Sequence, residues 1–260
     1  MPLIVGIDKL AVSSARQPFP EQTAFFRAKL GRLVPTERWT DMMREQHDVA
    51  FMVAGAAKAD LLADMAAAVD AAIAKGTGIE AFRKEFDGIV ARHGWDYRGE
   101  RNWRTRVIFQ TNLTSSYAAG RLKQLLSAEV QALKPYWMYR HSDGVLNPRP
   151  LHVSWNGLTL PADDPWWTQH YPPNDFGCQC YVTAVSARDA QRLGGRIADA
   201  PDDGTGPDGR PNGIGKGWDY MPGSTTVERS IKAKAESLPE PLRLSLLADI
   251  ASVKQRRGRP

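Results

Sequence analysis

The feature that most constrains the fold is a helical periodicity of apolar and small residues, which runs from Trp103 to about Ala132. Apolar or small residues recur there every three or four positions, at Ile108, Thr111, Ser115, Ala118, Leu122 and Leu125. Because this spacing places side chains on one helix face, and small side chains let a neighbour approach closely, we predict a long helix with one closely packed face. A second, polar row indicates a solvated face or a docking face, and it consists of Gln110, Thr114, Tyr117 and Arg121.

The chain before this helix is predicted to be helical as well. Apolar spacing favours helices over Glu21–Leu30, from an N-cap at Thr36 to Val53, from about Gly55 to Gly76, and from Ile79 to about Ala91. After Pro135 ends the long helix, alternating side chains predict strands at Tyr136–Tyr139 and Cys180–Val185. These elements predict an α+β fold, in which a helical N-terminal half precedes a compact domain with a small β-sheet and a turn-rich His/Cys segment.

The composition changes abruptly at Gly194. Nine Gly and four Pro among residues 194–223 predict a loop or linker rather than core. GTGPDG at 204–209 matches a dinucleotide-binding pattern, but no predicted strand precedes it and a proline interrupts it, so we reject a nucleotide site there. The organisation that we expect is a helical region at 1–98, a core domain at 99–193, a Gly/Pro-rich linker at 194–225, and a basic C-terminal helix and tail at 226–260.

Composition excludes several classes of protein. The hydrophobic fraction of 42% and charged fraction of 24% are typical of a folded chain, and no apolar run approaches the roughly 20 residues that span a bilayer. No secretory signal is visible at Met1–Lys9, so we expect the chain to stay in a reducing cytoplasm. Cys178 and Cys180 are too close in sequence to join distant parts of a fold, which excludes a disulfide framework.

The net charge of +5 is concentrated near the C-terminus. Residues 226–260 contain eight Lys or Arg and four Asp or Glu, so +4 of the net charge lies there. The balanced charge of the remaining chain argues against a body built as a nucleic-acid groove. The last basic residues are candidates for contact with DNA, RNA or an acidic protein, although such segments are more often solvated tails. They are Lys254, Arg256, Arg257 and Arg259.

The candidate site residues lie between His141 and Cys180. Cysteines two positions apart on a strand point to the same side, so Cys178 and Cys180 could share a metal ion, with zinc as the candidate and His152 as a third ligand. The C-x-C spacing differs from the knuckles of zinc ribbons and fingers. Two alternatives stay open, namely buried packing residues and a histidine-activated catalytic thiol, although neither a helix N-terminus nor a basic cluster flanks the cysteines.

Aromatic residues and prolines crowd the same part of the chain. We interpret them as a small, rigid platform that stabilises the fold or contacts another protein. The platform consists of Trp155, Trp166 and Trp167 with Pro165, Pro172 and Pro173.

Five short motifs follow one another in a defined order. They are IFQTNLTSSYAAGR at 108–121, KPYWMYRHSDGVLNPRPLH at 134–152, WNG at 155–157, DDPWW at 163–167 and YPPNDFGCQC at 171–180. In this order they resemble the phage head morphogenesis family, the minor head proteins similar to Mu protein F. The resemblance covers roughly Phe25–Val185, and it is specific because of the order of the motifs rather than any one of them.

The resemblance implies structural roles for residues that match the motifs of the family. These residues are Thr111, Asn112, Tyr117, Gly120, Arg121, Asp143, Arg149, Gly157, Asp164 and Pro173. The sequence departs from the family pattern at Gln110 and Gln179, where the family has arginines, so roles that need a positive charge there are not carried over. His170 stands where the family tends to have an aromatic residue, and it receives no role.

The resemblance also implies a function. It is that of a virion or procapsid component of a tailed phage or prophage, which assists head assembly near the portal and is present in the host cytoplasm during assembly. The implied partners are portal and capsid or scaffold proteins and, through the basic tail, packaged DNA, with no membrane and no enzymatic activity. The alternative from another class is a small metal- or thiol-dependent enzyme that uses His152, Cys178 and Cys180.

Overall fold

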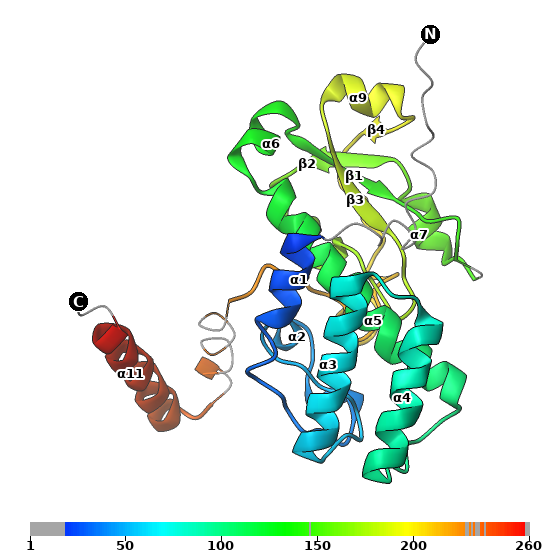
Figure 1. Cartoon of the computed structure of the whole chain (residues 1–260). Helices are drawn as coiled ribbons and strands as arrows, with labels where there is room; N and C mark the ends of the chain where they lie inside the picture. The colour runs from blue at the N-terminus through cyan, green and yellow to red at the C-terminus, as the bar shows by residue number, and fades with distance from the viewer. Residues whose placement is uncertain are drawn as a thin grey trace. The chain divides into compact units, whose positions relative to one another are not determined.

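The computed structural model describes residues 19–145, 147–226, 229, 231, 235–236 and 238–257 of the chain. Two compact units are distinguished, Met1–Ser224 and Thr225–Pro260. In the first unit, helices precede a small mixed sheet (Figure 1), so the predicted α+β class is confirmed.

The first half of this unit is a packed group of helices. Their bounds are Pro20–Arg27 (α1), Trp39–Asp41 (η2, a 3-10 turn), Gln46–Val49 (α2), Ala59–Lys75 (α3) and Ile79–His93 (α4). Helices α1, α3 and α4 bury apolar stripes in a common core that contains Phe26, Met65 and Phe86. Both α3 and α4 end at a glycine in the left-handed conformation, Gly76 and Gly94, which is a common way for a helix to terminate.

Helix α5, Arg101–Leu125, runs from the helical half to the sheet (Figure 1). Its first half packs into the helical core through Ile108, Phe109 and Leu113. Its second half packs into a second core, beside the sheet, through Ala118, Leu122 and Leu125. The predicted helix is interrupted before Ala132, because the Ser127 hydroxyl accepts the Val130 N–H at 3.3 Å and starts a new helix, α6, at Ala128–Leu133.

The sheet has four strands in the order β3-β1-β2-β4. Their bounds are Tyr136–Arg140 (β1), Leu158–Pro161 (β2), Tyr181–Val185 (β3) and Arg196–Ile197 (β4). Strand β1 pairs antiparallel with both β2 and β3, whereas β2 and β4 are parallel. Both predicted strands are therefore present, although the second begins one residue after Cys180.

The two faces of β1 pack against different layers. Trp137 and Tyr139 enter the core shared with α5, while Met138 joins a smaller cluster with Val185 and Ala190. This division follows from the alternation of side chains along a strand. The remaining short helices of the unit are Pro150–Ser154 (α7), Trp167–His170 (α8) and Ala187–Arg192 (α9).

Apart from strand β4 at Arg196–Ile197, the Gly/Pro-rich segment is a loop, as predicted, but it is not a linker. It belongs to the same compact unit as the sheet, and Ile214, Trp218 and Tyr220 are buried. The guanidinium of Arg44 forms a salt bridge with the buried carboxylate of Asp219, with 2.9 Å between Arg44 Nε and Asp219 Oδ1. The sequence pattern missed this packing because isolated large side chains between glycines have no helical or strand period.

The segment after Thr36 does not form the helix that was predicted from it. The carboxylate of Asp41 accepts the backbone N–H groups of Glu37 and Arg38 at 2.9 Å each, which closes a short 3-10 turn. Arg44 then adopts a φ of 54°, in the left-handed region, and this interrupts a continuous helix. The Thr36 hydroxyl is buried and finds no hydrogen-bond partner in the described part of the chain, so it is not an N-cap.

The second unit contains helix α11, Glu240–Arg257, within the region where a terminal helix was predicted. Lys254, Arg256 and Arg257 lie on its last turns. Their side chains, and the whole of Arg259, lie outside the part of the chain that the structure describes. Among the helices that the structure describes, none is both long and apolar enough to cross a membrane.

A small group of buried charges joins distant parts of the first unit. Lys29 is only 4% exposed, and burial lowers its pKa to about 8, although the charge of Asp48 opposes this shift. His47 lies half-buried beside it, and loss of solvent followed by the charge of Lys29 lowers the pKa of this imidazole to about 4. Asp48 Oδ2 also accepts the backbone N–H of Gly223 at 2.9 Å. The group therefore ties the end of the Gly/Pro-rich segment to the helical half.

The close contact between α1 and α5 yields a stability prediction. A Cβ atom at Gly120 would lie 2.7 Å from the backbone nitrogen of Gln22, so Gly120→Ala is expected to lower the free energy of unfolding by about 1–3 kcal/mol. Gly88→Ala, on open surface of α4, is the matched control and is expected to raise it by about 0.5–1 kcal/mol. Urea denaturation of both variants tests this, and equal effects would contradict the packing argument.

The buried ammonium of Lys29 yields a pH prediction. Its pKa is about 8 in the folded chain, against 10.5 for a lysine that is free in water, as in the unfolded chain. Between these values the unfolded chain binds more protons, so stability rises with pH. Relative to a Lys29→Met variant, the wild-type chain should gain on the order of 3 kcal/mol between pH 8 and pH 10.5. Urea denaturation of both proteins across this range measures the difference, and parallel pH curves would refute the burial of the charge.

Candidate functional site

Three potential metal-binding side chains come together, and a fourth, His141, lies beside one of them. His141 follows the last residue of β1, His152 lies on α7, and Cys178 and Cys180 lie on the turn before β3. The cysteines thus precede the strand on which they were predicted, yet the predicted grouping with His152 is present in the structure. His141 joins the group as a residue to which the sequence analysis gave no metal-binding role.

Arg149 brings the cysteine turn against α7. Its Nη2 atom donates to Asp175 Oδ2 at 2.9 Å and to the carbonyl oxygen of Phe176 at 3.0 Å. Arg149 also stands at the N-terminus of α7, three residues before His152. One guanidinium therefore fixes the loop that precedes Cys178 relative to the helix that carries the histidine.

The sulfur and nitrogen atoms of the group lie close together. The Nδ1 atom of His152 is 3.6 Å from the Sγ atom of Cys178 and 3.8 Å from that of Cys180. The Nδ1 atom of His141 is 3.5 Å from Cys180 Sγ. His152 and Cys178 are each 2% exposed and Cys180 is 8% exposed, whereas His141 is half-buried at the edge of the group.

The orientation of the His152 ring is set by its surroundings. Its Nε2 atom is 2.8 Å from the carbonyl oxygen of Gly213, which can only accept, so Nε2 carries a proton; in the neutral ring, Nδ1 then presents its lone pair to the sulfurs. The ring stacks on Trp155 at 5.2 Å between centroids. Gly213 has a φ of +85°, and a Cβ atom there would lie 2.6 Å from the Trp155 ring, so only glycine fits.

The two thiols influence each other's ionisation. The hydrogen bond with Cys180 is the main cause that lowers the pKa of Cys178, and His152 adds to it against the effect of burial. In turn, the hydrogen bond with Cys178, together with burial, raises the pKa of the Cys180 thiol. One thiol of the pair therefore loses its proton far more readily than the other, as expected for coupled groups.

The tryptophans form an interior layer rather than a contact surface. Trp155, Trp166 and Trp167 are all buried, and Trp155 Nε1 donates to Asp203 Oδ2 at 2.7 Å. His170 stacks on Trp166 at 4.1 Å, and burial lowers the pKa of its imidazole. The platform therefore stabilises the fold around the His/Cys group.

Several family-motif residues close turns around this layer. The N–H of Gly157 donates to the Tyr139 carbonyl at 2.8 Å, and its own carbonyl accepts the Arg196 N–H at 2.8 Å. Asp164 Oδ1 accepts the backbone N–H of Trp166 at 2.9 Å. Pro173 follows Pro172 through a cis peptide bond, whereas Asp143 is exposed.

The motif residues of α5 have more varied surroundings. Asn112 donates to the Ile108 carbonyl at 2.9 Å, and Arg121 donates to Gln124 at 2.6 Å. The ring of Tyr117 meets that of Phe19 edge-on at 5.4 Å, and Gly120 allows the approach of α1. Three members of the polar row of this helix, Thr114, Tyr117 and Arg121, thus have partners within the unit. No interaction that it makes distinguishes a docking face from a solvated one.

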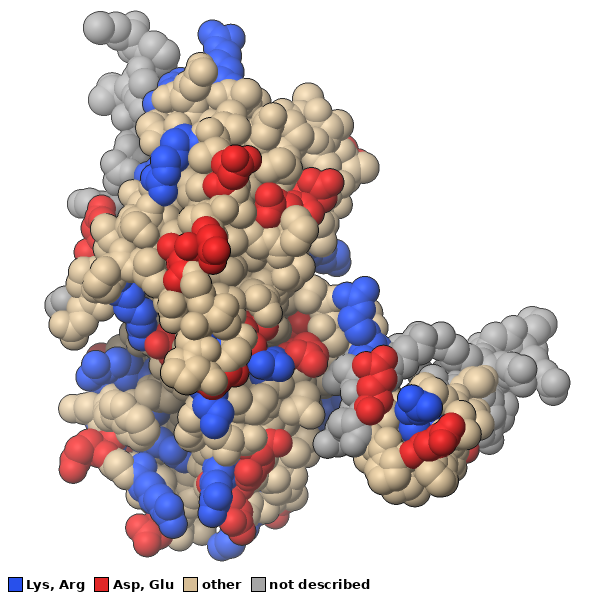
Figure 2. Space-filling view, turned by 180° about the vertical axis from the view of Figure 1, so that it is seen from behind, with Lys and Arg blue, Asp and Glu red and all other residues tan. Residues whose placement is uncertain are grey.

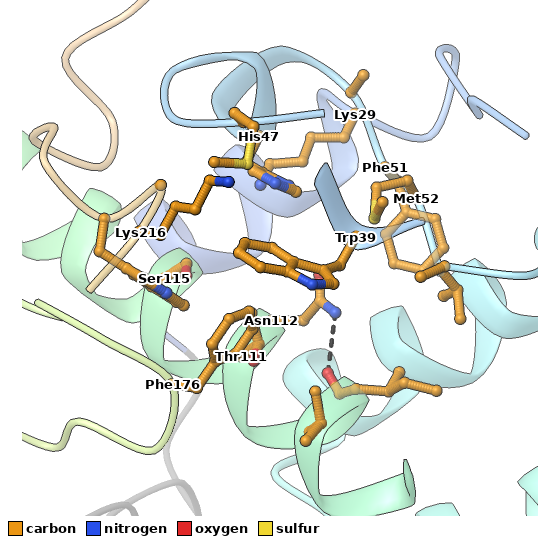
Figure 3. A pocket seen from close by; sticks show the side chains of 18 of the residues that line it. Lys29, Trp39, His47, Phe51, Met52, Thr111, Asn112, Ser115, Phe176 and Lys216 are labelled. Atoms are coloured by element: carbon orange, nitrogen blue, oxygen red, sulfur yellow. Dashed lines mark hydrogen bonds between the residues drawn. The ribbon is translucent and has the colours of Figure 1, made fainter. Parts of the chain in front are cut away.

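A separate cavity of about 480 Å³ lies between α5, the early loops and the Gly/Pro-rich segment. Thr111, Asn112 and Ser115 line it from α5, and the Trp39 ring lies across it (Figure 3). Trp39 meets Phe176 edge-on at 5.7 Å, and the Lys216 ammonium lies 6.0 Å from the centre of its ring. The sequence analysis missed this cavity because its walls come from segments far apart in the chain.

Comparison with known proteins gives two informative relatives. Putative capsid assembly protein F of Escherichia phage Mu is 31% identical over 200 residues, which are 71% of this chain and 44% of that protein. The Mu-like prophage FluMu F protein of Haemophilus influenzae is 34% identical over 173 residues, which are 63% of this chain and 41% of that protein. The chain thus spans less than half the length of either relative. No solved structure matches the chain.

The family comparison covers the helices and strands that build the site. Residues 63–183 match the family described as Phage Mu protein F like protein, and they include α5, β1, the His/Cys group and most of β3. This confirms the resemblance that the ordered motifs indicated. The central region of the chain, residues 63–183, is thus similar to the Phage Mu protein F like family.

Proposed function

We propose that the chain is a minor head protein of a tailed phage or prophage, which acts in head morphogenesis near the portal. The observation that carries this proposal is its 200-residue similarity to a protein named for capsid assembly. Portal and capsid or scaffold proteins are the proposed partners, and the virion or procapsid is the proposed location. The protein is proposed to be in the host cytoplasm while heads assemble.

The contacts of the motif residues support a structural role. Arg149 anchors a loop, Gly157 links two strands through its backbone, and Asp164 holds a turn. None of these contacts is directed at a common reacting atom. The thiols of Cys178 and Cys180 are also buried, whereas a catalytic thiol needs access to its substrate. These features favour a structural protein over the alternative of a thiol-dependent enzyme.

Genetic complementation with particle analysis tests the head function. Disruption of the gene in an inducible lysogen should reduce complete heads and plaque titre together, and the full chain supplied in trans should restore both. Mass spectrometry of purified heads should detect the chain at fewer copies than the major capsid protein. A chain with Arg98→Ala, at an exposed position outside the family motifs, is the matched control and should also restore both.

Two outcomes would contradict the proposal. One is normal head assembly without the gene, together with absence of the chain from purified particles. The other is turnover of a substrate that is lost on thiol modification, which would support the enzyme alternative.

We propose in addition that the basic C-terminal residues contact packaged DNA. On the face shown in Figure 2, basic and acidic side chains of the first unit are interspersed. The excess of positive charge lies instead in residues 226–260. Since phosphate contacts release counterions, such a contact would depend strongly on salt.

Charge removal at the tail tests the DNA contact. Replacing Lys254, Arg256, Arg257 and Arg259 with Gln should weaken DNA binding and reduce the slope of log K against log salt concentration by up to about 3.6. The matched control removes the same charge from exposed positions of the body, at Lys75, Lys84, Arg98 and Lys134. Fluorescence anisotropy with duplex DNA measures both variants, and equal losses would contradict a contact specific to the tail.

A further inference from the structure

We propose that His141, His152, Cys178 and Cys180 form a closed tetrahedral zinc site with a structural role. The sequence pattern suggested three of these residues, and their donor atoms all lie within 4.8 Å of one another. His141 lies beside Cys180 but outside this group of three, and we assign it as the fourth ligand, whose ring moves inward when the ion binds. The inference goes beyond the proposed head function, because it concerns how the domain is held together and does not depend on any partner.

The distances between the donor atoms match the edges of a zinc tetrahedron. With Zn–S near 2.3 Å and Zn–N near 2.0–2.1 Å, tetrahedral angles place a sulfur and a nitrogen about 3.6 Å apart. The separations from Nδ1 of His152 to the two sulfurs are 3.6 and 3.8 Å. That from Nδ1 of His141 to Cys180 is 3.5 Å. The folded chain therefore already holds Nδ1 of His152 at this spacing from both sulfurs, and Nδ1 of His141 at this spacing from Cys180.

The His152 ring is oriented as a zinc ligand. Its Nε2–H donates to the Gly213 carbonyl at 2.8 Å, and in the neutral ring this leaves the lone pair of Nδ1 directed at the thiols. Histidines that bind metals almost always donate their second ring nitrogen to a carbonyl or carboxylate in this way. Stacking on Trp155 further restricts rotation of the ring. The lone pair is thus presented to the ion without rearrangement.

Hydrogen bonds are available to both thiols, because Nδ1 of His152 lies within 4 Å of each sulfur and Nδ1 of His141 lies 3.5 Å from Cys180. A thiol is only a weak hydrogen-bond donor, however. A zinc ion satisfies both sulfurs and both imidazoles together. The binding step is balanced, since the two thiols release their protons to solvent and bind Zn²⁺ as thiolates.

His141 makes the proposed site closed rather than catalytic. A catalytic zinc keeps a position for water or substrate, whereas structural sites have four protein ligands. His141 is half-buried and lies at the edge of the group, beside Cys180. With His141 bound, the ion would have four protein ligands and no open position for water.

The proposed ion would join three segments that have little regular structure between them. The end of β1, helix α7 and the start of β3 would share one centre, with turn-rich chain between them. Because unfolded chains rarely hold a preformed site, the binding free energy of such an ion adds to the stability of the fold. Zinc would thus replace the covalent cross-links that a C-x-C pair cannot supply between distant segments.

Metal analysis of the full chain, purified under reducing conditions from zinc-supplemented medium, tests the proposal. We expect one zinc per chain by inductively coupled plasma mass spectrometry, and a lower melting temperature after chelation. Cobalt substitution should give the d–d bands of tetrahedral Co²⁺ with sulfur charge transfer, and X-ray absorption should fit two sulfur and two nitrogen neighbours. These measurements use the wild-type protein, so they hold even where a ligand variant fails to fold.

Variants then identify the ligands. Cys178→Ser and Cys180→Ser should lose the zinc, and His141→Gln should weaken its binding by about 100-fold or more. His170→Gln is the matched control, since this buried histidine bonds the Trp166 carbonyl and should leave one zinc per chain.

Three results would overturn the proposal. The first is a substoichiometric metal content with no tetrahedral cobalt spectrum. The second is a Cys178–Cys180 disulfide in protein from reducing medium. The third is unchanged zinc affinity in His141→Gln, which would refute the closed site. None of these measurements involves phage particles, so they remain independent of the head-assembly experiment.

Discussion

The packing of one helix into two cores is the constraint on which the rest of the first unit depends. The first half of α5 is surrounded by α1, α3 and α4, and its second half lies against the Trp137 face of the sheet. Small residues in its second half let neighbours approach closely, because Ala119 lies against Gly223 and Gly120 against Gln22. The strand and loops that carry the His/Cys group are thereby placed relative to the helical half.

The site itself is completed by chain that composition alone would assign to a flexible connection. Gly213 supplies the carbonyl that orients His152, and Asp203 accepts the Trp155 indole N–H. Burial of Ile214 and Trp218 in the core beside the sheet secures this part of the loop. Side chains between His141 and Cys180 therefore act only together with a segment more than 20 residues further along the chain.

The features that could be predicted from the sequence depend on residues close together in the chain, whereas those that could not be predicted depend on specific hydrogen bonds and on contacts between distant segments. Helices α3 to α5 and strand β1 follow from short-range periodicity, and the grouping of His152 with the two cysteines follows from residue type and spacing. The interruption of the helix after Thr36 has other causes. The Asp41 carboxylate accepts backbone N–H groups of the preceding residues, and Arg44 adopts a left-handed backbone conformation.

The remaining features of the site depend on contacts between distant segments. His141 and Gly213 are brought together with His152 only by the tertiary fold, and the cavity around Trp39 has walls from several segments. No periodic pattern in a single sequence encodes such contacts, since the local spacing of each side chain is ordinary. The order of the motifs, by contrast, indicated the resemblance to the family, because it combines information from several parts of the chain.

Many contacts of the Gly/Pro-rich segment with the rest of the unit use main-chain atoms. The Gly213 carbonyl accepts from His152, the Gly215 N–H donates to the Asn174 carbonyl at 2.8 Å, and the Gly223 N–H donates to Asp48. Such contacts depend on where the backbone runs and not on which side chains it carries. Over evolutionary time, the exposed positions of this segment are free to drift, while the glycines and the few anchoring aromatic residues resist replacement.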